Sequence, residues 1–309
     1  MKQQIEIIVP PEKIYEESFF RYIASRKLGI RTEEITAIVP VRRSVDARKS
    51  PVFHLMVDVY IGEQAPKNKP KYIYNPVEGN KKVIIVGFGP SGMYAALRLI
   101  ELGIKPIVLE RGKDVQTRRR DLRSLQREQL VNPDSNYCFG EGGAGTYSDG
   151  KLYTRAVKRG NVPKILEIFI QHGAHPDILI DTHPHIGSNK LPKIIAAVRQ
   201  TILNAGGEIH HGSRVTDFII KNNNLKGVIV NSNTEYLGDA VILAAGHSAR
   251  DIFYLLDKNK IKIEAKPFAM GVRIEHPQPL INEIQYHTKV KPENLPTANY
   301  SLASNIDGA

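Results

Sequence analysis

The sequence predicts an α/β protein in which a small α+β domain precedes a doubly wound, Rossmann-like domain with a β-meander insertion. Three observations lead to this fold class. Val83–Val86 is continuously apolar, as is typical of a strand buried on both faces of a parallel sheet. A glycine-rich turn follows it and opens a segment whose apolar residues keep helical spacing. A second apolar strand, Ala240–Leu243, lies far downstream and also ends in small residues and a glycine.

The chain has the composition of a folded globular protein. Its 309 residues are 41% hydrophobic and 24% charged, and this length suffices for two domains. The single cysteine, Cys138, excludes an intrachain disulfide and favours a reducing compartment. The sequence contains no apolar run of signal-peptide or membrane-spanning length, so we expect a cytoplasmic protein without a membrane span.

The net charge of +11 favours encounter with polyanions, so anionic cofactors, nucleic acid and acidic lipid are all open as partners. The densest basic cluster surrounds Arg118–Arg120. Aromatic residues do not alternate with these arginines, as they do on surfaces that bind single-stranded nucleic acid. We therefore interpret the cluster mainly as a solvated helix face.

The first part of the chain predicts a small α+β domain. An apolar strand, Ile5–Val9, precedes a helix that Pro11 opens and Gly29 ends. Two strands rich in β-branched and aromatic residues are expected next, at 35–41 and 52–61. The residues expected on the core face of the helix are Tyr15, Phe19 and Tyr22.

The turn after the first apolar strand, residues 87–92, has the G-x-G-x-x-G spacing of a dinucleotide-binding motif. Gly87 permits the tight turn, Gly89 lets the backbone approach a pyrophosphate, and Gly92 lets the helix pack closely on the strand. The amino terminus of the helix then faces the phosphates. A glycine turn without a ligand is the alternative, but the flanking strand and helix supply the context that the motif needs. Pro90 and Ser91 complete the residues expected at the phosphates.

An acidic residue closes the second strand of this βαβ unit. Glu110 lies 18 positions after Gly92, where a carboxylate accepts hydrogen bonds from an adenosine ribose. A 2′-phosphate on that ribose would require an arginine, so Glu110 argues against it. Arg111 stands next to Glu110 and could bind a 2′-phosphate, so a cofactor with that group stays an alternative. Both residues are expected to contact the cofactor.

The spacing continues to Ala96 and Gly103. This longer string resembles the dinucleotide-binding stretch of two-domain FAD proteins of the glutathione-reductase type. The resemblance implies that the cofactor is FAD and that its ADP half occupies the motif.

A glycine-rich loop supports the same cofactor. Five glycines stand in the eleven positions from Gly140 to Gly150, so backbone amides can crowd an anion or a ring. A flexible surface loop is the alternative, but a long glycine loop in a compact domain is more often functional. The loop residues expected to contact the cofactor are Gly142, Gly143, Gly145 and Ser148.

The downstream region predicts a helix at 191–203, a strand at 208–211 and a small antiparallel meander over 215–237. Asp239–Gly246 then forms an apolar strand that ends in small residues, and a buried strand with a tight exit would explain it. After the first motif, however, it resembles the second dinucleotide signature of the same flavoprotein superfamily. The resemblance implies cofactor contacts for Ala245 and Gly246, and for the backbone of Val215 near the adenine.

Three further motifs narrow the resemblance: Gly140–Leu152, Pro184–Gly187 and Gly271–Gln278. Together with Arg42–Lys49 they are similar to a bacterial family of uncharacterised FAD-dependent dehydrogenases, over nearly the whole chain. The resemblance implies an FAD-dependent oxidoreductase that transfers hydride or electrons through the flavin, with a small-molecule substrate or an electron-transfer partner.

These expectations divide the chain into three parts. Residues 1–75 are the small domain with a proline- and lysine-rich linker at 65–71, and residues 76–260 are the FAD-binding domain. Residues 261–309 are expected to begin a substrate domain. Members of the family continue beyond Asp307–Ala309, which predicts a truncated or split product.

Two other functions stay open, a flavin-bound protein that acts on nucleic acid and a fragment that keeps a nucleotide-binding half without catalysis. The histidines at 172–211 lack the ligand spacing of a metal site, so none is expected. Cys138 is expected to be a buried or incidental thiol in preference to a redox partner of the flavin. Candidate substrate contacts are Lys151, Arg155 and His185. The sequence assigns no catalytic residue.

Overall fold

The computed structural model describes residues 1–66, 72–148, 150–152, 154, 160–187, 189–267, 271–272 and 274–300. The chain forms two compact units. The first comprises 1–69, 179–184 and 267–309, and the second comprises 70–178 and 185–266. The expected linker residues 67–71 lie outside the described residues, as do Asp149, Arg155, Arg273 and Asp307–Ala309.

The first unit contains a three-stranded antiparallel sheet in the order β1-β3-β2. Its strands are β1 (Lys2–Val9), β2 (Ile35–Asp46) and β3 (Val52–Ile61), close to the predicted ranges. Helix α1 (Glu17–Leu28) crosses from β1 to the short 3₁₀ helix η2 (Thr32–Glu34). It ends at Gly29, whose φ of +68° is the left-handed conformation that favours glycine.

The predicted core face of α1 was confirmed for Phe19, which is partly buried against the core, and was wrong for Tyr15 and Tyr22. Pro11 opens a separate 3₁₀ helix, η1 (Pro11–Lys13), and α1 begins only at Glu17. Tyr15 therefore precedes the helix and is 68% exposed, and Tyr22 is 50% exposed. The inward residues of α1 are Phe20 and Ala24, which lie four apart on one helical stripe.

Two distant segments complete the first unit. Ile281 and Tyr286 of α7 (Gln278–Tyr286) lie in the same hydrophobic core as Ile7 and Leu55 of the sheet. Residues 179–184 add a short bridge at the edge strand β2, where Arg43 pairs with Asp181 at 2.7 Å. The structure thus groups the described part of 267–300 with the N-terminal unit, and the substrate domain stays a prediction.

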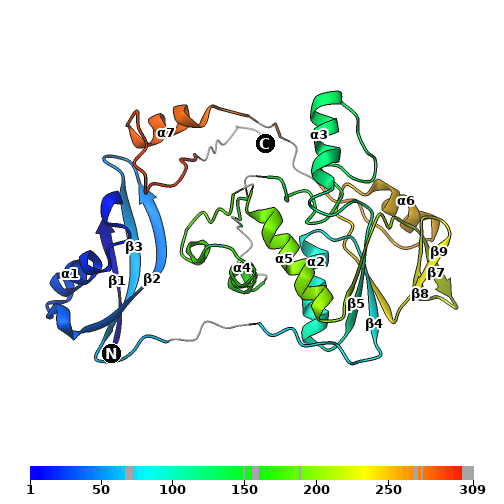
Figure 1. Ribbon diagram of the computed structural model, residues 1–309, viewed down its shortest axis with the longest axis horizontal. Helices are drawn as coiled ribbons and strands as arrows, with labels where there is room; N and C mark the ends of the chain where they lie inside the picture. Colours follow the sequence, from blue (N-terminus) through cyan, green and yellow to red (C-terminus); the bar gives the residue numbers. More distant parts are fainter. Residues whose placement is uncertain are drawn as a thin grey trace. The chain divides into compact units, whose positions relative to one another are not determined.

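The second unit is built on a parallel sheet in the order β10-β4-β5-β6 (Figure 1). Helix α2 (Pro90–Glu101) connects β4 to β5, and α5 (Leu191–Asn204) precedes β6. The arrangement confirms the predicted α/β fold class. The strands are β4 (Lys82–Val86), β5 (Lys105–Glu110), β6 (Glu208–His211) and β10 (Ala240–Leu243).

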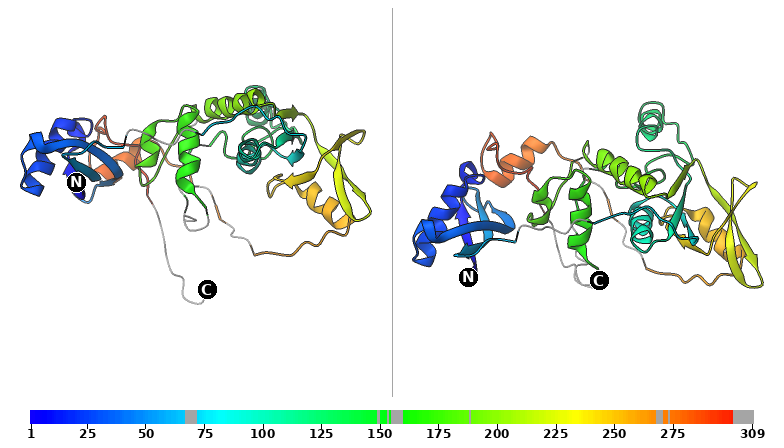
Figure 2. Two further views of the ribbon diagram at one scale, coloured as in Figure 1. Left: turned by 90° about the horizontal axis from the view of Figure 1, so that it is seen from below. Right: turned by 60° about the horizontal axis from the view of Figure 1, so that its bottom comes forward.

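The predicted meander is an antiparallel sheet beside helix α6 (Arg250–Lys258), as both views in Figure 2 show. Ile84 and Val86 of β4 share a hydrophobic core with Val228 of the meander and Ile252 of α6. The meander and α6 therefore cover one face of the parallel sheet. Its strands are β7 (Val215–Lys221), β8 (Asn224–Val230) and β9 (Thr234–Leu237).

The remaining helices of this part of the chain are α3 (Arg118–Glu128), α4 (Val162–Gln171) and the 3₁₀ helix η3 (Pro176–Leu179). Asn161 caps α4 by accepting a hydrogen bond from the Lys164 amide. Among the residues that the structure describes, no helix has both the length and the apolar character needed to cross a bilayer.

Candidate nucleotide-binding site

A cavity of about 520 Å³ opens in the second unit where three neighbouring parallel strands end. Val86 of β4, Leu109 of β5 and Leu243 of β10 line it. The carboxyl ends of the strands are where doubly wound sheets bind their ligands, and this volume is typical of a small-molecule site.

The cavity brings together most of the residues predicted to contact a cofactor, although they come from distant parts of the sequence. They lie in the first glycine turn, at the end of β5, in the glycine loop, at the start of β7 and after β10. These residues are Gly87, Gly89, Pro90, Ser91, Glu110, Arg111, Gly143, Gly145, Val215, Ala245 and Gly246.

Three predicted contact residues do not line the cavity. A Cβ on Gly92 would overlap the carbonyl oxygen of Gly87, so Gly92 serves the packing of α2 on the turn. Gly142 donates its N–H to the Phe88 carbonyl oxygen at 2.8 Å, and the Ser148 hydroxyl donates to the Gly145 carbonyl oxygen at 2.7 Å. Within this structure, these residues shape the loops behind the cavity wall.

The glycine turn leaves the amino terminus of α2 open. Gly87 has a φ of +103°, and a Cβ there would lie 2.6 Å from the Ala244 carbonyl oxygen, so both backbone and packing require glycine. Gly89 has a φ of −75° and precedes α2 without a side-chain cap. A Cβ on Gly89 would lie 3.6 Å from Gly143 Cα, which is ordinary contact. Neither the backbone conformation nor the packing of the described residues excludes a side chain at 89, and Gly89 lines the cavity.

Glu110 is almost fully buried, and backbone amides hold its carboxylate. Oε2 accepts from the Phe88 N–H at 2.7 Å, and Oε1 accepts from the N–H groups of Gly112 and Gly140 at 2.8 and 3.0 Å. Because a carboxylate oxygen has two lone pairs, Oε2 keeps one acceptor position. The carboxylate thus ties the glycine turn to the glycine loop and still accommodates one hydroxyl donor.

Arg118 anchors the glycine loop, and its predicted place on a solvated helix face was wrong. The side chain is fully buried, with a relative exposure of 0%. Its guanidinium donates at 2.9 to 3.1 Å to four carbonyl oxygens of the loop region and stacks on the Tyr147 ring. The four oxygens belong to Asn136, Tyr137, Glu141 and Gly143.

The glycine loop also contains a buried acid that the sequence reasoning missed. Glu141 Oε2 accepts from the Val115 amide at 2.8 Å and from Arg199 of α5 at 2.9 Å, and His211 Nε2 lies 4.0 Å away. Burial raises the pKa of the Glu141 carboxyl above its usual range and lowers the pKa of His211. Only the three-dimensional arrangement identifies this group, because its members are far apart in the sequence.

The remaining candidates differ in their relation to the cavity. Cys138 is exposed and lines it, so the expectation of a buried thiol was wrong, although an incidental one is still allowed. Lys151 pairs with His185 in an isolated antiparallel bridge, and neither residue lines the cavity. Within the described ranges, no three His, Cys, Asp or Glu side chains gather as metal ligands would.

These features match what the ADP half of a dinucleotide requires. The open helix amino terminus suits a pyrophosphate, and the acceptor position on Glu110 suits a ribose hydroxyl. The space in front of Gly89 is the space that a Cβ would fill. The residues present therefore fit a dinucleotide such as FAD.

Two family matches lie in the first compact unit. Residues 1–60 match a domain of unknown function (DUF8436), and residues 267–309 match the family described as FAD-dependent protein, C-terminal domain-like. The second match agrees with FAD as the predicted cofactor.

Several proteins are similar to larger parts of the chain. A protein of Clostridium beijerinckii, described only as uncharacterized, is 34% identical over 294 residues, which are 90% of this chain and 55% of that protein. A thiamine thiazole synthase of Methanococcus vannielii is 27% identical over 58% of this chain and 60% of its own length. The chain thus spans a little over half the length of these curated relatives.

Solved structures give partial likenesses. The THI4 protein of Thermovibrio ammonificans is 20% identical with a TM-score of 0.39, covering 59% of this chain and 64% of its own. A glycine oxidase of Bacillus cereus is 16% identical with a TM-score of 0.30, covering 58% and 59%.

Proposed function

We propose that the chain binds FAD in the cavity at the ends of β4, β5 and β10, and that it belongs to an FAD-dependent oxidoreductase. The observation that carries the proposal is Gly89. It stands before the uncapped amino terminus of α2 and lines the cavity, and its φ and its described neighbours would admit a side chain. The match of 267–309 to a domain of FAD-dependent proteins supports the choice of cofactor.

Each part of the cavity has a role in this proposal. The open amino terminus of α2 holds the pyrophosphate, with the Ser91 N–H as the donor that faces the cavity, because Pro90 has no N–H. Glu110 accepts a hydrogen bond from the ribose through Oε2, and the start of β7 at Val215 borders the adenosine. The glycines that face the rest of the cofactor are Gly143, Gly145 and Gly246.

A bound flavin supplies transfer of a hydride or of single electrons. The chain binds the cofactor, orients it and sets the polarity around it. In particular, Arg118 holds the loop carbonyl oxygens in place, so that the glycines of the loop present a fixed wall.

A protein that acts on nucleic acid is the less favoured alternative. It depended on the net charge of +11 and on the arginine cluster as a surface for phosphates; within that cluster Arg118 is fully buried and bound to carbonyl oxygens, whereas Arg119 and Arg120 are exposed. Arg111 is held in ion pairs with Asp134 and Asp251. We therefore propose a small-molecule substrate or an electron-transfer partner.

The test is the visible absorption spectrum of the chain after incubation with FAD and desalting, with Gly89→Ala as the variant. We expect flavin bands in the wild-type chain and at least about tenfold weaker FAD binding in the variant, because the methyl group occupies the space before the helix terminus. The matched control is Gly160→Ala, where a Cβ meets no atom of the described residues within 4 Å. A wild-type chain that never retains FAD, or a Gly89→Ala chain that binds it as tightly as wild type, contradicts the proposal.

A further inference from the structure

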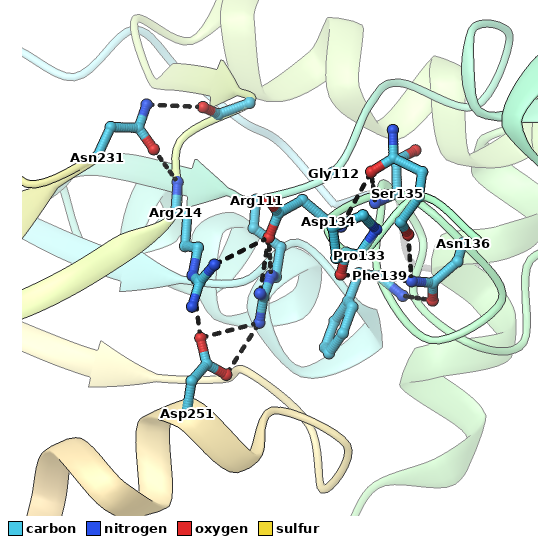
Figure 3. Close-up of polar contacts among 12 residues, drawn as sticks. Arg111, Gly112, Pro133, Asp134, Ser135, Asn136, Phe139, Arg214, Asn231 and Asp251 are labelled. Atoms are coloured by element: carbon cyan, nitrogen blue, oxygen red, sulfur yellow. Dashed lines mark hydrogen bonds and ion pairs between the residues drawn. The ribbon is translucent and has the colours of Figure 1, made fainter. Parts of the chain in front are cut away.

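Two arginines and two aspartates form a closed network (Figure 3). Arg111, Arg214 and Asp251 of this network line the cavity, as Glu110 does. Arg111 donates through Nε and Nη2 to Asp134 at 3.0 and 2.7 Å, and through Nη1 to Asp251 at 3.0 and 3.2 Å. Arg214 donates through Nε to the same Asp251 at 3.2 Å. All three guanidinium nitrogens of Arg111 are therefore engaged with carboxylates.

The four residues come from four separate segments that the fold brings together. Arg111 follows β5, Asp134 lies in the loop after α3, Arg214 precedes β7, and Asp251 is in the first turn of α6. The Arg111 guanidinium also stacks on the Phe139 ring, with its carbon 4.1 Å from the ring centroid. These contacts hold the network in one arrangement.

The backbone on both sides of the network is fixed as well. Asn231 accepts from the Arg214 N–H at 3.2 Å and donates to the Gly212 carbonyl oxygen at 3.0 Å. Asn132 accepts from the Asp134 N–H at 3.0 Å. A ligand that drew an arginine out of the network would have to break several of these contacts.

The charges around this end of the cavity do not favour an anion. Glu110, Asp134 and Asp251 provide three carboxylates, whereas Arg111 and Arg214 provide two guanidinium groups. A ribose hydroxyl needs only the acceptor position on Glu110 Oε2. A phosphate monoester carries a charge of about −1.5 to −2 at neutral pH and would have to compete with Asp134 and Asp251 for the guanidinium groups of Arg111 and Arg214.

We propose that Asp134 and Asp251 make the cavity selective for a dinucleotide without a 2′-phosphate, by holding Arg111 and Arg214 in ion pairs that a phosphate would have to break. The inference rests on the proposed dinucleotide function and states which dinucleotides the site accepts. It assigns this specificity to a network whose aspartates lie 23 and 140 residues from Arg111.

The test compares two ligands that differ only in the group at issue, ADP-ribose and 2′-phospho-ADP-ribose. Their dissociation constants are measured by calorimetry on the full chain at fixed ionic strength, because salt screens exposed charges. We expect wild type to bind ADP-ribose at least about tenfold more tightly. The double variant Asp134→Asn with Asp251→Asn frees both arginines. It should lower the ratio of the two dissociation constants, 2′-phospho-ADP-ribose over ADP-ribose, at least about tenfold.

Two further variants keep the test decisive. Asp251→Asn alone leaves Asp134 on Arg111 and should shift the ratio in the same direction by a smaller factor. Asp217→Asn is the control, because this aspartate forms a similar ion pair with Lys258 at 2.8 Å and does not line the cavity. Its ratio should equal that of wild type.

The outcomes separate this inference from the proposed function. If wild type retains FAD but binds both ligands equally, or if the folded aspartate variants keep the wild-type ratio, the specificity proposal is overturned and the FAD site stands. If the chain retains neither FAD nor ADP-ribose, both proposals fall.

Discussion

Single residues near the cavity owe their roles to contacts that their neighbours in sequence do not predict. Arg118, Arg119 and Arg120 are consecutive, yet only Arg118 is buried, whereas Arg119 and Arg120 are exposed. Burial lowers the pKa of the Arg118 guanidinium, and the Glu110 and Glu141 carboxylates oppose that shift. A buried cation bound to four carbonyl oxygens is costly to remove. The Asn136 and Tyr137 oxygens then lose the Arg118 donor, and the Glu141 and Gly143 oxygens keep Thr146 as donor.

We predict that Arg118→Met lowers the free energy of unfolding by more than about 2 kcal/mol, since it removes a fully buried side chain and its hydrogen bonds to four carbonyl oxygens of the glycine-loop region. Urea unfolding followed by circular dichroism measures the change. Arg120→Met, an exposed neighbour on the same helix, should change stability by no more than about 0.5 kcal/mol. Equal stability of the two variants would show that the carbonyl contacts of Arg118 do not hold the loop.

At the scale of elements, strand β4, the glycine turn and helix α2 form one unit in which two glycines have different physical reasons. The absence of a side chain at Gly89 leaves space in the cavity, whereas its absence at Gly92 lets helix α2 pack against the Gly87 carbonyl oxygen. The βαβ elements were predictable because each has a strong local pattern. Helix α1 was less so, because a 3₁₀ turn after Pro11 shifts the start of the helix and with it the buried face.

We predict that Gly92→Ala prevents α2 from packing on its strand, since the added methyl would overlap backbone that cannot rotate away. The expected result is a loss of stability of about 3 kcal/mol or more, or no folded protein, measured as a fall in thermal midpoint without any ligand. Gly89→Ala is the matched comparison, and its thermal midpoint should equal that of the wild-type chain. A Gly92→Ala protein of wild-type stability would mean that the helix can shift to admit the side chain.

At the scale of the whole molecule, the two compact units are not two consecutive stretches of sequence. The core of the first unit combines β1, β3 and α1 with α7 and with Leu295 and Ala298. The described residues that line the cavity all belong to the second unit. A change in the core of the first unit should therefore affect its stability and leave cofactor binding intact.

We predict that Ile281→Ala destabilises the first unit by about 2 kcal/mol or more, because Ile281 is buried in that core. Thermal unfolding and FAD retention are measured on the same sample, and FAD retention should stay at the wild-type level. Ile284→Ala is the control, since Ile284 lies on the same helix and is 53% exposed. Loss of FAD with Ile281→Ala would show that the two units do not fold independently.

The sequence by itself determined the α/β class and the order of the strands along the chain, and most of the cofactor contacts that it predicted line the cavity. It could do so because the glycine turn, the apolar strands and the acid after β5 are local patterns of short range. The tertiary structure alone decided which glycines face the cavity, that Arg118 is buried, and that Asp134 and Asp251 hold Arg111. These facts depend on contacts between residues far apart in the sequence, where burial and pairing are set by the packing of whole elements.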